Sequence, residues 1–107
     1  MIIFLGVLNA STARILTYNL LNYEDENNRE DDYVTILDLV EPDLIIAQEI
    51  IGQTGYSHFQ SDVLDVLEPN IWSSAPFTNQ SAQQDIALYY KSDIFTFIGT
   101  NVVYTAQ

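Results

Sequence analysis

The sequence predicts one mixed domain of the α/β (α+β) class, with its elements in the order β-α-β-α-β-β. Short runs of β-branched and aliphatic residues alternate along the chain with apolar residues at helical spacing, which is the pattern of such a domain. The chain has 107 residues, of which 48% are hydrophobic, so it has enough material for one small buried core. It contains no cysteine, which excludes a disulfide framework, a thiolate zinc site and a cysteine nucleophile.

The first thirteen residues are uncharged, begin with an apolar run and end in small residues. Ser11 and Ala13 stand where a signal peptidase would cut, so we interpret residues 1–13 as the remnant of a secretion signal. The alternative is a hydrophobic first strand, because the apolar run is too short to span a bilayer. We therefore expect a secreted protein without a membrane span, whose domain occupies residues 14–107.

A strand, a helix and a second strand are predicted next. Residues 14–19 mix β-branched, aromatic and aliphatic side chains and end in asparagine, as in a short buried strand that enters a turn. Apolar residues at i, i+3, i+4 and i+7 over residues 33–40 indicate one face of a helix, which Pro42 ends. Residues 43–49 are apolar in the middle and polar at the end, as expected for a central strand covered on both faces.

The second half of the chain predicts a further helix and then strands. Gly52 and Gly55 are expected to break the chain before a second helical stripe, which ends at Pro69. The apolar members of this stripe are Phe59, Val63, Val66 and Leu67. Residues 70–84 predict a short strand followed by an exposed polar loop.

The last segment contains two runs of strand-forming residues. Residues 86–90 and 95–98 are rich in aliphatic and aromatic side chains and are separated by a short polar turn. This spacing predicts that the two strands form a hairpin.

The composition is strongly acidic, with 15 acids and a formal net charge of −12. The surface potential should repel phosphate backbones over most directions of approach, so a basic nucleic-acid-binding face is disfavoured. A bound divalent cation could still supply the positive charge that a polyanion requires. The three cationic residues are Arg14, Arg29 and Lys91.

Polar side chains close both strands of the predicted β-α-β unit. Asn19 ends the first strand and Glu49 ends the second. A right-handed crossover makes the strands parallel and brings these ends to the same edge of the sheet, where α/β proteins bind their ligands. A glutamate carboxylate suits Mg²⁺, and an asparagine amide can bind a phosphate oxygen or support the metal. The alternative is that both residues are turn formers or caps.

The two segments as a whole resemble a known family. RILTYNL at residues 14–20 and EPDLIIAQEI at residues 41–50 resemble the first two motifs of the endonuclease/exonuclease/phosphatase family, and residues 85–93 look like a later strand of it. The resemblance implies the N-terminal half of a two-sheet α/β sandwich of the DNase-I-like type. It also implies hydrolysis of phosphodiester bonds in nucleic acid or another phosphodiester substrate with Mg²⁺, or with Mn²⁺ or Ca²⁺. Asn19 would lie near the metal and the scissile phosphate, and Glu49 would bind the metal.

Later motifs of that family have no counterpart in the chain. These are the catalytic tyrosine or arginine segment, the Asp-x-Asn motif that orients the attacking water, and the Ser-Asp-His motif whose histidine acts in acid/base catalysis. The sole histidine, His58, is expected to be a surface or loop residue, and Asp85 and Asp93 lack the required neighbours. We therefore expect an incomplete fragment that is inactive alone. The rival hypothesis is a non-catalytic secreted binding or interaction module, whose acidic surface serves solubility.

Calcium and stacking sites are less well supported by the sequence. A calcium loop that starts at Asp25 would need glycine at its sixth position and glutamate at its twelfth, which are Glu30 and Ile36 here. Residues 24–32 are therefore expected to form a solvated loop. Trp72 and the seven tyrosines could stack on sugars or bases, but their β-rich setting favours the core and the strand faces.

Overall fold

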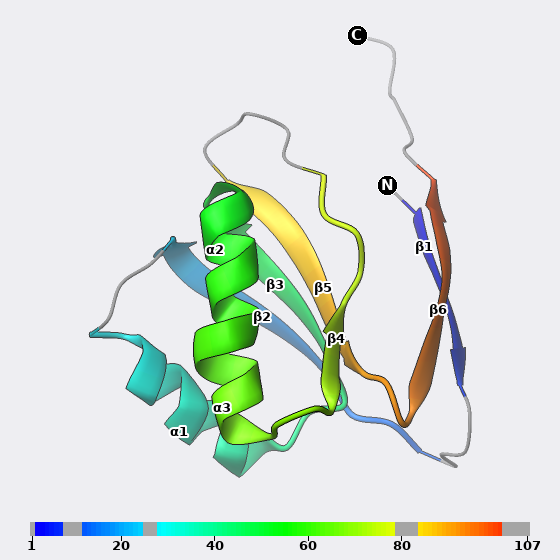
Figure 1. Cartoon of the computed structure of the whole chain (residues 1–107), viewed down its shortest axis with the longest axis horizontal. Coiled ribbons are helices and arrows are strands. Elements are labelled where there is room, and N and C mark those ends of the chain that lie inside the picture. The colour runs from blue at the N-terminus through cyan, green and yellow to red at the C-terminus, as the bar shows by residue number, and fades with distance from the viewer. Residues whose placement is uncertain (1, 8–11, 25–27, 79–83, 102–107) are drawn as a thin grey trace, which may run out of the picture.

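In a computed structural model of the chain, residues 2–7, 12–24, 28–78 and 84–101 are described (Figure 1). In chain order the elements are β1 (Ile2–Val7), β2 (Ile15–Tyr23), α1 (Glu30–Val40), β3 (Leu44–Ile50), α2 (Gly52–Phe59), the π-helical turn η1 (Gln60–Leu64), α3 (Asp65–Leu67), β4 (Trp72–Ser74), β5 (Asp85–Lys91) and β6 (Phe95–Asn101). No helix among these is long and apolar enough to cross a membrane.

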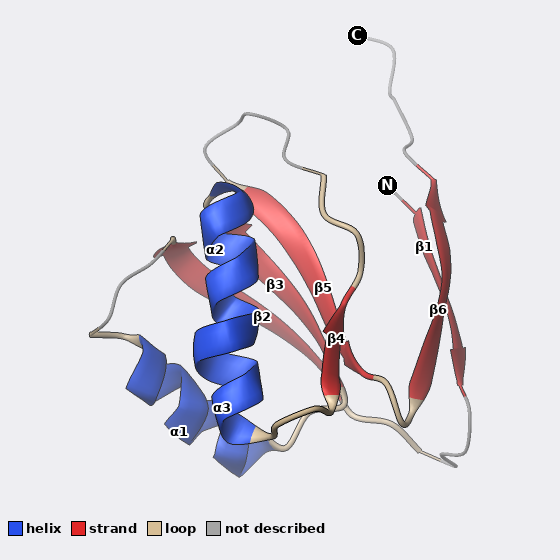
Figure 2. Ribbon diagram, viewed as in Figure 1, coloured by secondary structure: helices blue, strands red, loops and turns tan. Residues whose placement is uncertain are grey.

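Four strands form a mixed sheet in the order β2-β3-β5-β4. β2 and β3 are parallel, whereas β5 runs antiparallel to both β3 and β4. The helices lie together on one face of this sheet (Figure 2). The predicted β-α-β unit, its central strand and the mixed α+β class are therefore confirmed.

The main core fills the space between the helices and the sheet. Tyr33 and Leu37 of α1 are buried there, as the helical stripe predicted, whereas Ile36 is 42% exposed. Aromatic rings meet edge to face across this core, for example Tyr33 with Tyr23 at 5.5 Å between ring centroids. Most of the tyrosines in this part of the chain thus serve packing.

Gly52 marks the predicted break between β3 and the following helix, whereas Gly55 does not break the chain and lies within α2. Gly52 has φ = 64°, in the left-handed region that glycine adopts without a steric penalty, so it turns the chain from β3 into the helix. A Cβ atom at Gly55 would lie only 2.5 Å from the carbonyl oxygen of Tyr23. Glycine at position 55 therefore allows the helix backbone to approach the end of β2.

The π-helical turn η1 shifts the face that the second helix buries. Across it the amide of Asp65 bonds to the carbonyl oxygen of Gln60, five residues earlier. The extra residue turns the helix by about 100° relative to a continuous α-helix. Leu64 is consequently buried, and Val66, which the stripe predicted to be in the core, is 62% exposed.

The predicted hairpin between residues 86–90 and 95–98 is wrong. β5 pairs with β3 and β4, whereas β6 leaves the sheet and pairs antiparallel with β1. The separate β1–β6 ribbon packs on the sheet face opposite the helices, through a second cluster of apolar side chains that includes Leu5, Phe97 and Leu88. Residues 2–7 thus form a strand here, and cleavage of a signal within residues 1–13 stays a prediction.

The remaining expectations concern the two polar loops. The short strand within residues 70–84 is confirmed as β4, and residues 79–83 of the following loop lie outside the described residues. The solvated loop over residues 24–32 is shorter than expected, because α1 already starts at Glu30, whose side chain is buried. Acidic residues fill the first turn of α1, where the helix dipole favours negative charge.

Candidate functional site

The structure brings Asn19 and Glu49 into contact at the carboxyl ends of the parallel strands β2 and β3. Their regular pairing ends where Asn19 lies opposite Gln48. Beyond this point the register is irregular, and β2 continues to Tyr23 whereas β3 ends at Ile50, one residue past its predicted end. The Nδ2 group of Asn19 donates a hydrogen bond to Oε2 of Glu49. The predicted convergence of the two side chains is therefore a feature of the fold.

Three non-glycine residues at this edge have left-handed backbone conformations, namely Leu21 (φ = 55°), Asn22 (φ = 59°) and Glu49 (φ = 58°). Asparagine tolerates this region, but leucine and glutamate adopt it at a cost of about 1–3 kcal/mol each. Such conformations persist only where surrounding contacts fix them, and they concentrate at sites that bind ligands. The backbone irregularity thus lies at the place where the candidate side chains meet.

Several hydrogen bonds hold the bulge of β2 in place. Oδ1 of Asn19 accepts from the backbone N–H of Leu21 at 2.9 Å. Nη1 of Arg29 donates to the carbonyl oxygens of Leu20 and Leu21, each at 2.9 Å. The hydroxyl of Tyr33 also donates to the carbonyl oxygen of Leu20, at 2.7 Å. The asparagine therefore fixes the bulge with its oxygen while it holds the glutamate with its nitrogen.

A further residue of this site, Gln84, was missed in the sequence. It precedes β5, and its Nε2 group donates to Oδ1 of Asn22 at 2.6 Å and to Oε1 of Glu49 at 3.3 Å. Because Asp85 pairs with Ile50 across β3 and β5, residue 84 comes beside the end of β3. The sequence did show that Gln84 is a polar residue directly before a buried strand. It did not show that this strand, β5, would run antiparallel to β3 and bring Gln84 to the end of β3.

The chemistry of the site depends on one carboxylate. Both oxygens of Glu49 accept a hydrogen bond from a neutral amide, and each keeps a second lone pair that could bind a cation. Within the described residues, no three acidic or histidine side chains come together as a metal-binding group. Mg²⁺ nonetheless takes as few as one carboxylate, with waters and substrate phosphate in its other positions. The donor set fits a solvent-rich Mg²⁺ site of this kind.

An apolar hollow of about 520 Å³ borders the same edge, between the β1–β6 ribbon and the sheet. Gln84 and Asp85 lie at one end of its lining, and Ile15 and Ile86 contribute apolar surface that is 62% and 55% exposed. The candidate site therefore combines a polar edge with an adjoining apolar surface.

A second hollow, of about 700 Å³, lies at the opposite ends of β2 and β3. Here Nζ of Lys91 is 3.5 Å from Asp43 and 3.4 Å from Glu68, and it lies 5.6 Å from the ring centroid of Trp72. The guanidinium of Arg14 donates to the carbonyl oxygen of Val40. This hollow is polar, and within it Asp43 and Glu68 share the ammonium group of Lys91.

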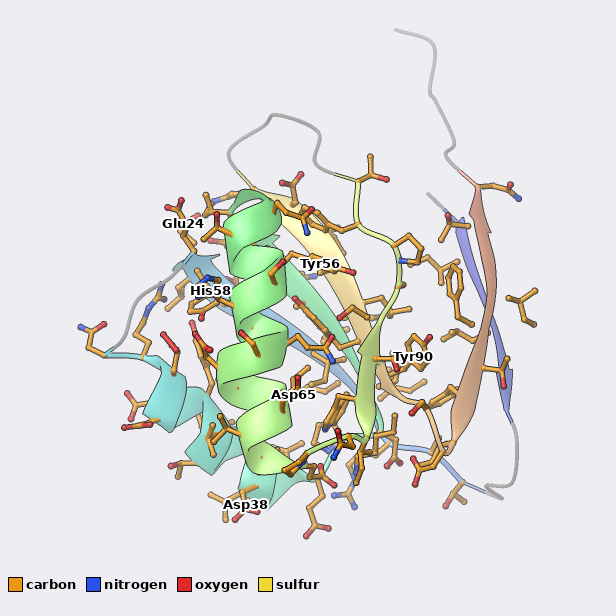
Figure 3. The ribbon with its side chains drawn as sticks, in the orientation of Figure 1. Glu24, Asp38, Tyr56, His58, Asp65 and Tyr90 are labelled. Carbon is orange, nitrogen blue, oxygen red and sulfur yellow. The ribbon has the colours of Figure 1, made fainter. Side chains whose placement is uncertain are left out.

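Of the other titratable residues considered in the sequence, Asp85 lines the adjoining hollow, whereas His58 and Asp93 lie away from the candidate site. His58 lies in α2 rather than in a loop (Figure 3). Its Nδ1 atom is 3.1 Å from Oδ2 of Asp62. Asp93 is exposed in the turn between β5 and β6. Asp25, the first position of the discounted calcium loop, is outside the described residues.

Comparisons with known proteins give no further assignment. No protein-family model matches the chain, and neither a curated protein nor a solved structure is significantly similar to it.

Proposed function

We propose that this chain is the metal-binding part of a Mg²⁺-dependent hydrolase of phosphodiester bonds, of the endonuclease/exonuclease/phosphatase type. The observation that supports it best is the contact between Asn19 and Glu49 at the carboxyl edge of two parallel strands. The motifs around these residues resemble that family, and a ligand site at this edge is the usual one in α/β sheets. A two-sheet sandwich of the DNase-I-like type is part of the same proposal.

Glu49 would bind the metal, and Asn19 would hold the carboxylate and approach the phosphate. When bound, Mg²⁺ supplies a Lewis acid at the phosphoryl oxygen, and Mn²⁺ or Ca²⁺ could take its place. The cation would also offset the negative charge of a protein with a net charge of −12, which otherwise repels a phosphodiester. The substrate would be nucleic acid or another phosphodiester, and the protein would act outside the cell.

Water activation needs groups in addition to these. The only histidine of the chain, His58 of α2, contacts Asp62 of η1, and neither an Asp-x-Asn nor a Ser-Asp-His motif occurs in the sequence after residue 50. General acid/base catalysis contributes about 10²–10⁴-fold to such reactions. We therefore expect the 107-residue chain to bind the metal without turning over a phosphodiester such as bis(p-nitrophenyl) phosphate. Robust turnover by this chain would show that the active site has been misplaced.

Metal binding is the direct test. In a Mn²⁺ titration of the ¹⁵N-labelled chain, paramagnetic broadening should begin at the side-chain amides of Asn19 and Gln84, and Glu49→Gln should remove it. Glu41→Gln is the matched control, because Glu41 is also a glutamate in the left-handed region (φ = 53°), at the other end of the strand pair. Equal broadening in the unsubstituted chain and in Glu49→Gln would refute the metal site.

The second candidate is a non-catalytic interaction module. It is favoured by the apolar hollow beside β1 and by the exposed isoleucines at its rim. In that case Asn19 and Glu49 are turn-stabilising residues, and Glu49→Gln changes stability but not the response to Mn²⁺. The titration thus separates the two candidates.

A further inference from the structure

The end of β5 contributes to the candidate site in a way that the family motifs do not indicate. Gln84 is far from both motifs in sequence, and β5 brings it beside the end of β3 because it runs antiparallel to that strand. We propose that Gln84 is a positioning residue, which fixes the carboxylate of Glu49 before a metal arrives. This inference rests on the proposed function, because it assigns Gln84 a part in the same metal site.

Asn19 and Gln84 form a clamp on Glu49, with one hydrogen-bond donor on each side of β3. Asn19, from β2, donates to Oε2 of Glu49, and Gln84, before β5, donates to Oε1. The strand order β2-β3-β5 places β3 between the two donors. The plane of the carboxylate is therefore set by amides from both neighbouring strands.

Gln84 is itself held in place. The same Nε2 group that reaches Glu49 at 3.3 Å also donates to Oδ1 of Asn22 at 2.6 Å. Asn22 adopts φ = 59°, a conformation that asparagine accepts more readily than most residues. The left-handed turn in β2 thus presents a side-chain oxygen that orients Gln84 toward the glutamate.

Such a clamp is needed because a glutamate side chain that is not held can adopt many rotamers. Ordering a glutamate side chain costs up to about 2 kcal/mol of conformational entropy, and Glu49 is only partly buried. Neutral amide donors fix the carboxylate without neutralising its charge, so its remaining lone pairs stay available to a cation. Residues that orient a metal ligand in this way typically change metal affinity by about 10- to 100-fold when removed.

The test is the Mn²⁺ dissociation constant of the full 107-residue chain, with Gln84→Met as the main variant. Methionine keeps the length of glutamine and lacks the amide donor. Gln53→Met is the matched control, because Gln53 is also an exposed glutamine and its amide donates within α2, to Ser57 at 3.2 Å. We expect Gln84→Met to weaken Mn²⁺ binding by about 10-fold or more, and Gln53→Met to leave it unchanged.

The melting temperature distinguishes positioning from a structural role. We expect Gln84→Met and Gln53→Met to melt at the same temperature, so that only the metal affinity separates them. If Gln84→Met fails to fold, Asn22→Gly tests the same clamp, because glycine accepts the left-handed backbone and removes the oxygen that orients Gln84.

The outcomes separate this inference from the proposed function. Unchanged Mn²⁺ affinity in Gln84→Met, or in Asn22→Gly where that variant is used, overturns the role of Gln84 and leaves Glu49 as the ligand. Absence of localised Mn²⁺ binding in the unsubstituted chain overturns the proposed function and this inference together.

Discussion

The two ends of the β2–β3 strand pair satisfy their charged groups in different ways. At the amino end, Asp43 and Glu68 share the ammonium group of Lys91, which offsets one of their two negative charges. At the carboxyl end, Glu49 is held by the neutral amides of Asn19 and Gln84 and keeps its charge. The larger of the two hollows is at the amino end, but we propose the cation at the carboxyl end, where the carboxylate is held by neutral donors. The presence of acidic residues alone would not have distinguished the two ends of the strand pair.

The backbone differs between these ends as well. The carboxyl end contains the left-handed residues Leu21, Asn22 and Glu49, whereas the other non-glycine residues of this kind in the described part of the chain are Glu41 and Asn70. Glu41 follows α1, where its N–H bonds to the carbonyl oxygen of Leu37, so its conformation is that of an ordinary helix end. The conformations at the carboxyl end have no such routine explanation, and the contacts of the candidate site account for them.

The largest expected effect comes from Gly55→Ala, which should disturb the carboxyl end alone. The added Cβ would lie 2.5 Å from a backbone oxygen of Tyr23, and no change of rotamer relieves a clash with the main chain. We expect a loss of about 2–3 kcal/mol in the free energy of unfolding, measured by urea denaturation. Backbone chemical shifts should change around Asn19 and stay constant around Asp43.

Gly99→Ala is the control for that substitution. A Cβ at Gly99 meets no atom within 4 Å, and alanine is preferred to glycine within a strand. Its stability should stay equal or rise slightly. A similar loss in both variants would show that the close approach at Gly55 is not the cause.

A somewhat smaller effect is expected at the amino end from Lys91→Met. The lysine side chain is 14% exposed and lies between two carboxylates, so its removal leaves Asp43 and Glu68 without their shared cation. We expect a loss of about 2 kcal/mol in the free energy of unfolding, because breaking a partly buried pair leaves an uncompensated charge. Mn²⁺ binding at Glu49 should not change.

Asp93→Asn provides the baseline for an exposed charge on the same turn, and its stability should change by less than about 0.5 kcal/mol. If Lys91→Met were equally neutral, the ion pairs at the amino end would contribute nothing net, and the contrast between the two ends would rest on geometry alone.

The smallest expected effect is on the pH dependence of stability, through a tyrosine in the core that both strand ends share. Burial raises the pKa of the Tyr89 phenol above its ordinary value of 10.0, and its hydroxyl donates to the carbonyl oxygen of Tyr56 at 2.8 Å. The unfolded chain therefore loses this proton at a lower pH than the folded chain. Its stabilising contribution is complete below pH 10 and decreases above it, by about 1.4 kcal/mol per pH unit.

Tyr89→Phe should reduce that alkaline loss of stability, which thermal melts on either side of pH 10 would measure. A weaker dependence should remain, because burial also raises the pKa values of Tyr18 and Tyr56. Spectroscopic probes at the two strand ends should report the same transition. An alkaline transition confined to one end would mean that the ends do not share a cooperative core.

The sequence predicted the local and sequential parts of this fold. The strand-helix-strand unit, the central position of β3 and the meeting of Asn19 with Glu49 follow from periodicity and from the geometry of parallel strands. The hairpin prediction was wrong because proximity along the chain favoured β5 with β6, whereas β6 pairs with the distant β1. Gln84 was missed for the same reason, since its partners lie 35 and 62 residues away.

Glycine was misread for a different reason. Gly55 was predicted to interrupt the chain, but its lack of a side chain serves contact between a helix and a strand end, which no local pattern reveals. The metal-binding role of Glu49 stays a prediction, because it depends on a ligand and not on the chain's own contacts.

The π-helical turn shifts the pattern of buried residues in the second helix by one position. The shift keeps Phe59, Val63 and Leu64 in one core. Gln60, at the start of the turn, donates to the carbonyl oxygen of Trp72 at 2.7 Å and contacts Ser74. A deletion of one residue within 60–64 would allow a continuous α-helix and leave the buried faces of both halves unchanged, because the π turn absorbs one extra residue. An α-helical path through all five residues of the turn would instead bring Val66 toward the core, so the turn decides which side chains of the second half are buried.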